Sequence, residues 1–208
     1  MTTNDRTDRL VWIDCEMTGL SLTADALVEI AALVTDSDLN VLGEGVDVII
    51  KPPAEALEQM DDFVRDMHTK SGLLAELDNG VTLEEAQATV LAYLHEYCDP
   101  EARPPLAGNT VGTDRNFVAR DMPELESFLH YRIIDVSSIK ELSRRWYPRA
   151  YFASPAKKGN HRALADIQES IEELRYYRDA VFVAQPGPTS DAAKKIAQEH
   201  GGSITGIA

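Results

Sequence analysis

The sequence predicts an α/β domain in which helices flank a mixed central sheet. Three segments rich in Val and Ile come first, separated by turn-type residues, which is typical of an antiparallel meander. Helical patterns then alternate with single strand-like segments, which is typical of an α/β domain. The chain has 208 residues, of which 44% are hydrophobic, enough for a buried core.

Five strands are expected, each short and rich in branched apolar residues. Turn-type residues at 36–40 separate the second strand from the third, and Pro52 and Pro53 end the meander. The strands are expected at residues 10–13, 27–34, 41–50, 104–108 and 132–135.

Capping patterns and apolar periodicity indicate the helices. Thr82 with Glu85, and Ser138 with Glu141, each form a capping-box pattern. We expect one domain over residues 1–184 and a tail over 185–208 that is partly helical or flexible. The helices are expected at residues 83–94, 112–120, 139–146, 161–180 and 191–200, with a loop at 147–159.

The charge excludes several classes of protein. Lys and Arg total 20 against 35 Asp and Glu, so the net charge is −15. This argues against a protein that coats long nucleic acids or binds anionic membranes.

Apolar runs of five residues at most, and a polar start, predict neither a membrane span nor a secretion signal. Cys15 and Cys98 show no CxxC pattern, which favours the reducing cytoplasm.

Acidic residues recur where elements begin or end. Asp14 and Glu16 follow the first strand and share one face of it, where a cation such as Mg²⁺ or Mn²⁺ would offset their charge. Asp114 opens a helix, and His161 precedes Asp166 by five residues. Each feature alone also fits an ordinary structural role: solvated acids, an Asp that complements a helix dipole, a capping His.

The order of these acids along the chain, together with the local sequence around them, indicates a family. Residues 8–182 resemble the Asp-Glu-Asp-Asp-His 3′-to-5′ exonuclease superfamily and, within it, the oligoribonuclease family, which implies a ribonuclease-H-like fold. The blocks that carry the resemblance are WIDCEMTGL at 12–20, HTKSGL at 68–73, GNTVGTD at 108–114, YRIIDVS at 131–137 and HRALADI at 161–167.

The resemblance implies a mechanism and a metal cofactor. Two divalent cations, Mg²⁺ or Mn²⁺, would be held by the four acids, and His161 would be the general base. The implied reaction is 3′-to-5′ hydrolysis of short RNA, especially dinucleotides, to 5′-mononucleotides. Linear products of cyclic-dinucleotide breakdown are among the implied substrates. The metal ligands would be Asp14, Glu16, Asp114 and Asp166.

The resemblance also implies a substrate pocket. Leu20 and Phe63 would be wedges against the bases, although the family often has Trp in place of Phe63; ordinary core packing is the alternative. Thr110, which replaces the usual Ser, would cap the 5′ phosphate together with Arg132 and Ser137. Tyr131 would reach this pocket from a second subunit, which implies a homodimer; an ordinary polar strand edge is the alternative for Tyr131 and Arg132.

Two other functions remain open at this point. A proofreading-type exonuclease on single-stranded DNA would share the metal site, but the 131–137 segment disfavours it. A non-catalytic nucleotide-binding protein would not need all four acids and His161.

Residues 140–162 carry a net charge of +6, which predicts a basic lip beside His161 that attracts short anionic substrates. The alternative is an ordinary solvated loop. The cations are Lys140, Arg144, Arg145, Arg149, Lys157, Lys158 and Arg162.

Overall fold

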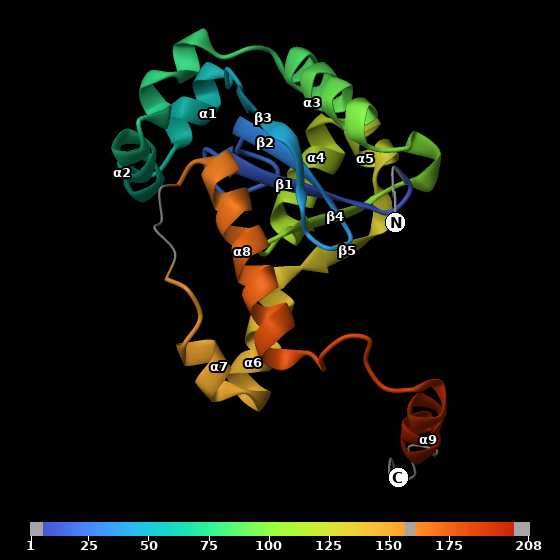
Figure 1. Cartoon of the computed structure of the whole chain (residues 1–208). Coiled ribbons are helices and arrows are strands. Elements are labelled where there is room, and N and C mark those ends of the chain that lie inside the picture. The colour runs from blue at the N-terminus through green and yellow to red at the C-terminus, as the bar shows by residue number, and fades with distance from the viewer. Residues whose placement is uncertain (1–5, 157–160, 202–208) are drawn as a thin grey trace, which may run out of the picture.

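The structure, a computed structural model, describes residues 6–156 and 161–201. A five-stranded mixed sheet with the order β3-β2-β1-β4-β5 forms its centre (Figure 1). β1, β2 and β3 form the predicted antiparallel meander, whereas β4 and β5 add in parallel next to β1. The strands are β1 (Arg9–Met17), β2 (Leu27–Asp36), β3 (Val41–Ile49), β4 (Pro105–Gly108) and β5 (His130–Asp135).

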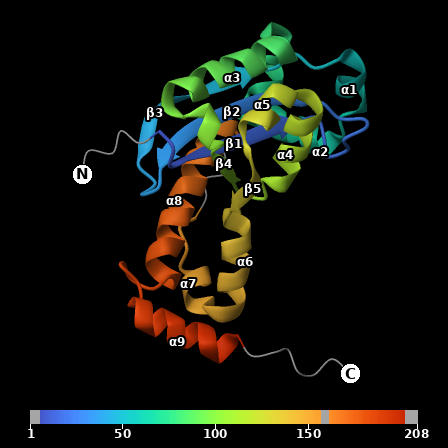
Figure 2. The ribbon, with the colours of Figure 1, turned by 90° about the vertical axis from the view of Figure 1, so that its right-hand side faces the viewer.

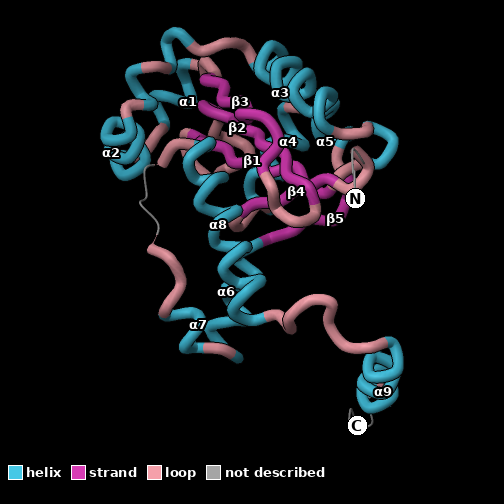
Figure 3. Tube along the Cα trace, viewed as in Figure 1, coloured by secondary structure: helices cyan, strands magenta, loops and turns pink. Residues whose placement is uncertain are grey.

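Helices cover both faces of this sheet, with α3, α4 and α5 on one face and α8 on the other (Figures 2 and 3). α1 and α2 follow the meander at one end of the sheet (Figure 1). Among the described residues, no helix is long and apolar enough to cross a membrane. The helices are α1 (Ala54–Gln59), α2 (Asp62–Ser71), α3 (Leu83–Tyr97), α4 (Gly112–Asp121), α5 (Pro123–Phe128), α6 (Val136–Trp146), α7 (Pro148–Phe152), α8 (Ala163–Val181) and α9 (Ser190–His200).

The alternation of side chains along β1 divides the core into two parts. Ile13 and Cys15 pack with the helices α3 and α4, whereas Trp12 packs with Ile167 and Ile171 of α8. β2 is buried on both faces because helices cover both sides of the sheet, which explains its almost continuous apolar sequence.

Of the two capping boxes that the sequence predicts, the structure contains one. Thr82 and Glu85 form the expected reciprocal capping box at the start of α3. The capping box expected at Ser138 is wrong: α6 begins at Val136, and the side chain of Asp135 accepts the Ser137 N–H instead. Glu141 is bound to Arg side chains of its own helix, so it is not available to complete a capping box.

Two further boundaries differ from the sequence prediction. The expected loop at 147–159 contains the short helix α7, which a proline at its first position favours; residues 157–160 lie outside the described part. α8 begins at Ala163, so His161 precedes the helix and has a left-handed backbone with φ of 48°. The predicted tail helix is present as α9, and none of its residues, all of them described, is buried.

Candidate active site

Asp14 and Glu16 lie within β1, because this strand continues to Met17 and does not end before them. Trp12 belongs to the core part beneath α8, so Asp14 and Glu16, at the same alternation, face α8 as well. Glu16 is 9% exposed and Asp14 is half-buried. The prediction that the two acids share a face is therefore confirmed.

Asp114 reaches the same strand from the other side of the sheet. It lies in the first turn of α4 and is buried. Its Oδ1 accepts the backbone N–H of Cys15 at 2.9 Å, so the carboxylate is held against β1 between Asp14 and Glu16. Position in the first turn of a helix alone suggests that Asp114 only complements the helix dipole. The hydrogen bond to Cys15 indicates that Asp114 also belongs to the acidic site on β1.

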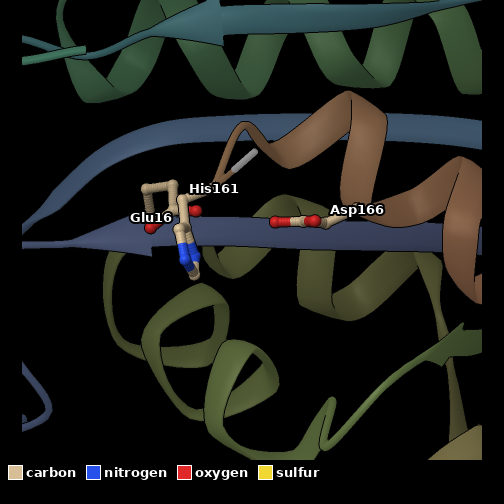
Figure 4. A group of neighbouring side chains, drawn as sticks. All are labelled: Glu16, His161 and Asp166. Atoms are coloured by element: carbon tan, nitrogen blue, oxygen red, sulfur yellow. The ribbon is translucent and has the colours of Figure 1, made fainter. Parts of the chain in front are cut away.

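Glu16, His161 and Asp166 meet at the junction of β1 and α8 (Figure 4). Each offers one ligand atom, and these three atoms lie within 4.8 Å of one another. Asp166 is in the first turn of α8, and His161 is on the segment that leads into it. Because His161 is outside the helix, the five-residue spacing does not separate the two side chains as a continuous helix would.

The site holds a surplus of negative charge. The pKa of Glu16 is raised to about 8, mainly by burial and then by the charges of Glu29, Asp166 and Asp114, against a lowering effect of Arg162. Burial likewise raises the pKa of Asp114 to about 6, although the Cys15 hydrogen bond lowers it. Such shifts mean that, among the described residues, the charged forms of these acids lack a sufficient counter-charge.

This donor set fits divalent cations. Carboxylate oxygens are the preferred ligands of Mg²⁺ and Mn²⁺, and a bound cation would favour the ionised form of acids whose pKa is raised. The structure brings Glu16 and Asp166 into one group with His161; Asp14 and Asp114 lie outside that group, next to it along β1.

The two predicted wedge residues are not part of the core. Leu20 and Phe63 are 76% and 78% exposed. Phe63 lies at the start of α2, and Leu20 follows β1. The fully buried His68 of α2 donates its Nε2–H to the carbonyl of Met17 at 2.9 Å, which ties the helix that carries Phe63 to the end of β1.

Thr110 and Ser137 converge on a third residue, Asp135. Oδ1 of Asp135 accepts the backbone N–H of Thr110 at 2.9 Å, the N–H of Ser137 at 2.9 Å and the Ser137 hydroxyl at 2.6 Å. Thr110 has a left-handed backbone with φ of 57°. The segment after β4 and the start of α6 are thereby joined at one oxygen atom.

Tyr131 and Arg132 are exposed side chains on the edge strand β5. Tyr131 is 71% exposed, and the Arg132 guanidinium lies over its ring, 5.4 Å from the centroid. The pair is therefore open to a ligand or to a second subunit.

Among the described cations of the predicted basic lip, Arg162 is beside the site, whereas those of α6 and α7 lie away from it. α7 lies against the C-terminal half of α8, because the Tyr176 hydroxyl donates to the carbonyl of Ala150 at 2.6 Å. That point is about 20 Å along α8 from its first residue. Four of the cations are also paired with acids, and Lys157 and Lys158 are outside the described residues. The pairs are Lys140–Glu173, Arg144–Glu141, Arg145–Glu141 and Arg162–Glu29.

The sequence reasoning missed three residues that organise the site. Asp135 lies in the 131–137 block but was not singled out. Arg162 was counted only as part of the basic segment, whereas it forms an ion pair with Glu29. Glu29 itself had a usable signal, since it is a lone acid inside an apolar strand, and such an acid needs a partner when it is buried.

Comparison with known proteins identifies the family of this chain. The exonuclease family model (RNase T) matches residues 11–174. Relatives named oligoribonuclease are 70% identical over 93% of this chain in Streptomyces coelicolor, and 64% identical over 95% in Cutibacterium acnes. The chain belongs to the oligoribonuclease family. The matches cover 96% and 98% of those relatives, so nearly the whole length is shared.

Solved structures support the fold. A product-bound exonuclease I matches with a TM-score of 0.61 at 15% identity over 83% of this chain and 44% of that one. The Escherichia coli exonuclease I complex with single-stranded DNA matches with a TM-score of 0.60 at 16% identity over 84% and 40%. The predicted ribonuclease-H-like exonuclease fold is confirmed, and membership in the family confirms the predicted enzyme class, an exonuclease that hydrolyses phosphodiester bonds.

Proposed function

We propose that the protein removes 5′-mononucleotides from the 3′ end of short oligoribonucleotides, with dinucleotides as preferred substrates, including the linear products of cyclic-dinucleotide breakdown. The meeting of Glu16, His161 and Asp166 at the junction of β1 and α8 carries this proposal. It joins oxygen ligands for a metal ion to a histidine that can act as a base, the combination used in metal-assisted hydrolysis of a phosphodiester.

Two divalent cations, Mg²⁺ or Mn²⁺, are the proposed cofactors, with Asp14, Glu16, Asp114 and Asp166 as their ligands. When bound, they supply positive charge that stabilises the attacking and leaving oxygens of the displacement. The four negative charges of these carboxylates balance the positive charge of two divalent cations, which supports a count of two cations. The raised pKa values of Glu16 and Asp114 support the need for cations.

His161 is the proposed general base. Its side chain is exposed and lies within reach of Glu16 and Asp166, so it can approach a water molecule at the scissile phosphate. The imidazole takes a proton from this water, whose oxygen forms a new bond to phosphorus. The bond from phosphorus to the 3′ oxygen of the preceding nucleotide breaks, and that oxygen leaves with the electron pair and acquires a proton.

The substrate is proposed to lie between two sets of side chains. Leu20 and Phe63 contact the bases, and their exposure supports this role. At the other end Thr110, Arg132 and Ser137 cap the 5′ phosphate, where the Arg132 guanidinium can bind two phosphate oxygens. A pocket that is closed at both ends admits a dinucleotide and excludes longer chains.

A homodimer in the cytoplasm is proposed as the working form. Tyr131 extends from the edge strand and is 71% exposed, which leaves it free to enter the pocket of a partner subunit. Cys15 and Cys98 are buried free thiols, which suits a reducing compartment. Apolar side chains around α6, α7 and the end of α8 are also exposed and suit a protein interface: Leu142, Trp146, Tyr147, Phe152, Phe182 and Val183.

One assay tests the substrate and the direction of cleavage. RNA of two to seven nucleotides, labelled at the 5′ end, is incubated with Mg²⁺, Mn²⁺ or EDTA, beside single-stranded DNA of the same lengths. We expect metal-dependent, stepwise shortening of the labelled RNA from its 3′ end down to a labelled 5′-mononucleotide, with the dinucleotide converted fastest. Internal cleavage, a preference for DNA, or equal rates at all lengths would contradict the proposal.

A variant in the same assay tests the phosphate cap. Arg132→Ala should abolish the preference for dinucleotides over heptamers, because the guanidinium no longer recognises the terminal phosphate. Arg144→Ala, which removes an exposed arginine of α6, is the matched control and should keep the preference. An unchanged preference in Arg132→Ala would overturn this assignment.

A further inference from the structure

A fully buried acid, Glu29, lies directly beside the candidate site. It is on β2 and pairs with Glu16 in the register of the two antiparallel strands. One oxygen of Glu29 accepts Nε of Arg162 at 2.8 Å, and the other accepts the backbone N–H of Ala163 at 3.1 Å. A single carboxylate therefore holds the two residues that follow His161.

Arg162 extends this contact to a second acid. Its two terminal nitrogens donate to the two carboxylate oxygens of Glu76, at 3.0 and 3.3 Å. Glu76 lies between two short helical turns, Leu73–Ala75 and Leu77–Asn79. The guanidinium therefore joins β2, inside the sheet, to the segment that follows α2. Because the guanidinium is planar and rigid, these hydrogen bonds fix the orientation of the Arg162 side chain.

His161 itself has a backbone conformation that needs support. Its φ of 48° is in the left-handed region, which is uncommon for a residue with a side chain and which contacts with the surrounding chain can stabilise. The contacts of Arg162 and Ala163 with Glu29 fix the chain immediately after this residue.

We propose that Glu29 and Arg162 are positioning residues that hold His161 in this conformation, with its imidazole within reach of Glu16 and Asp166. Neither residue takes part in proton transfer. They act through His161, so this inference rests on the proposed function for the role of that histidine.

Arg162→Gln tests the proposal by kinetics. It removes both ion pairs of the guanidinium. We expect kcat on a labelled RNA dinucleotide to fall by about 10- to 100-fold, since a small displacement of a reacting group is enough for such a loss. The KM should stay within about twofold because no proposed substrate contact changes. Arg145→Gln, which removes an exposed ion pair within α6, is the control and should leave both constants unchanged.

A double-mutant cycle separates positioning from a general structural role. In a His161→Ala background, Arg162→Gln should lower kcat by no more than about twofold, because the group that it positions is already absent. A loss of the same factor in both backgrounds would overturn the proposal, and so would a change confined to KM.

Hydrogen exchange gives a readout that does not depend on activity. In Glu29→Leu, which keeps similar bulk but offers no hydrogen-bond acceptor, the amide of Ala163 should exchange faster than in the wild type, while the amide of Trp12 in the core strand stays protected. Unchanged protection of Ala163 would overturn the role of Glu29. If the wild type released no mononucleotide, the proposed function would fail, but the exchange experiment would still judge the contacts made by Glu29.

Discussion

The backbone N–H of Cys15 donates a 2.9 Å hydrogen bond to Oδ1 of Asp114, across 99 positions of the chain. Cys15 stands between the two acids of β1, so this bond places a third carboxylate beside them. Its position depends on the sheet, because β4 lies parallel to β1 and α4 follows β4. The acidic site is thus a product of the strand order.

Replacement of His161 tests the general base. We expect His161→Ala to lower kcat on a dinucleotide by about 10²- to 10⁴-fold, the usual contribution of a positioned base. The melting temperature should change little because the side chain is exposed. His200→Ala, in α9, is the control. A folded His161→Ala protein with wild-type turnover would refute the assignment.

The raised pKa values predict how the metal-free protein responds to pH. Between the ordinary pKa of Glu16 and its folded value of about 8, the folded state binds more protons than the unfolded state. The free energy of unfolding therefore decreases as pH rises toward 8. In EDTA, we expect a lower melting temperature at pH 8 than at pH 6.5, and restoration by Mg²⁺ or Mn²⁺ at pH 8.

Glu16→Gln is the control for this effect, because the amide does not titrate. Its melting temperature in EDTA should depend less on pH over the same interval. A wild-type protein whose metal-free stability rises between pH 6.5 and 8 would contradict the prediction.

Mixing of subunits tests whether Tyr131 acts from a partner. Tyr131→Ala and His161→Ala are each expected to be nearly inactive on dinucleotides. In a randomly exchanged mixture, about a quarter of the sites would combine an intact His161 with an intact Tyr131 from the other chain. Recovery of about a quarter of the wild-type rate is therefore expected. No recovery after demonstrated exchange of subunits would show that Tyr131 does not act in trans.

The boundary proposed after residue 184 can be tested by truncation. A chain of residues 1–184 should keep its melting temperature within about 2 °C, because α9 buries none of its residues. Its kcat should also be retained, since the proposed site residues all precede the tail. Loss of cooperative unfolding in the truncated chain would show that the tail is part of the domain.

The sequence predicted features that depend on local patterns. The apolar strands, the capping box at Thr82 and the acids on one face of β1 were all recognisable, because each needs only neighbouring residues. Resemblance to known proteins supplied the candidate site residues. The sequence pattern of Ser138 and Glu141 predicted a start of α6 at residue 139, which is too late because the helix begins at Val136. In the structure Asp135 caps the helix, and Glu141 binds Arg144 of the same helix.

Features that depend on distant contacts could not be predicted in this way. The charges of residues 140–162 predicted a basic lip, but Arg162 is committed to Glu29 and Glu76, from two other parts of the chain. Similarly, only the packing of α8 on the sheet shows that His161 lies outside the helix and beside Glu16.

The bond from the Ser137 hydroxyl to Asp135 has a consequence for the choice of substrate. At 2.6 Å this hydroxyl already gives its single proton to a carboxylate. The hydroxyl could donate a hydrogen bond to a terminal phosphate only by giving up its bond to Asp135, and the negative charge of Asp135 would also repel the phosphate. If Ser137 and Arg132 cap the 5′ phosphate as proposed, a phosphorylated end has to displace this internal contact, and the Arg132 guanidinium offsets the repulsion from Asp135.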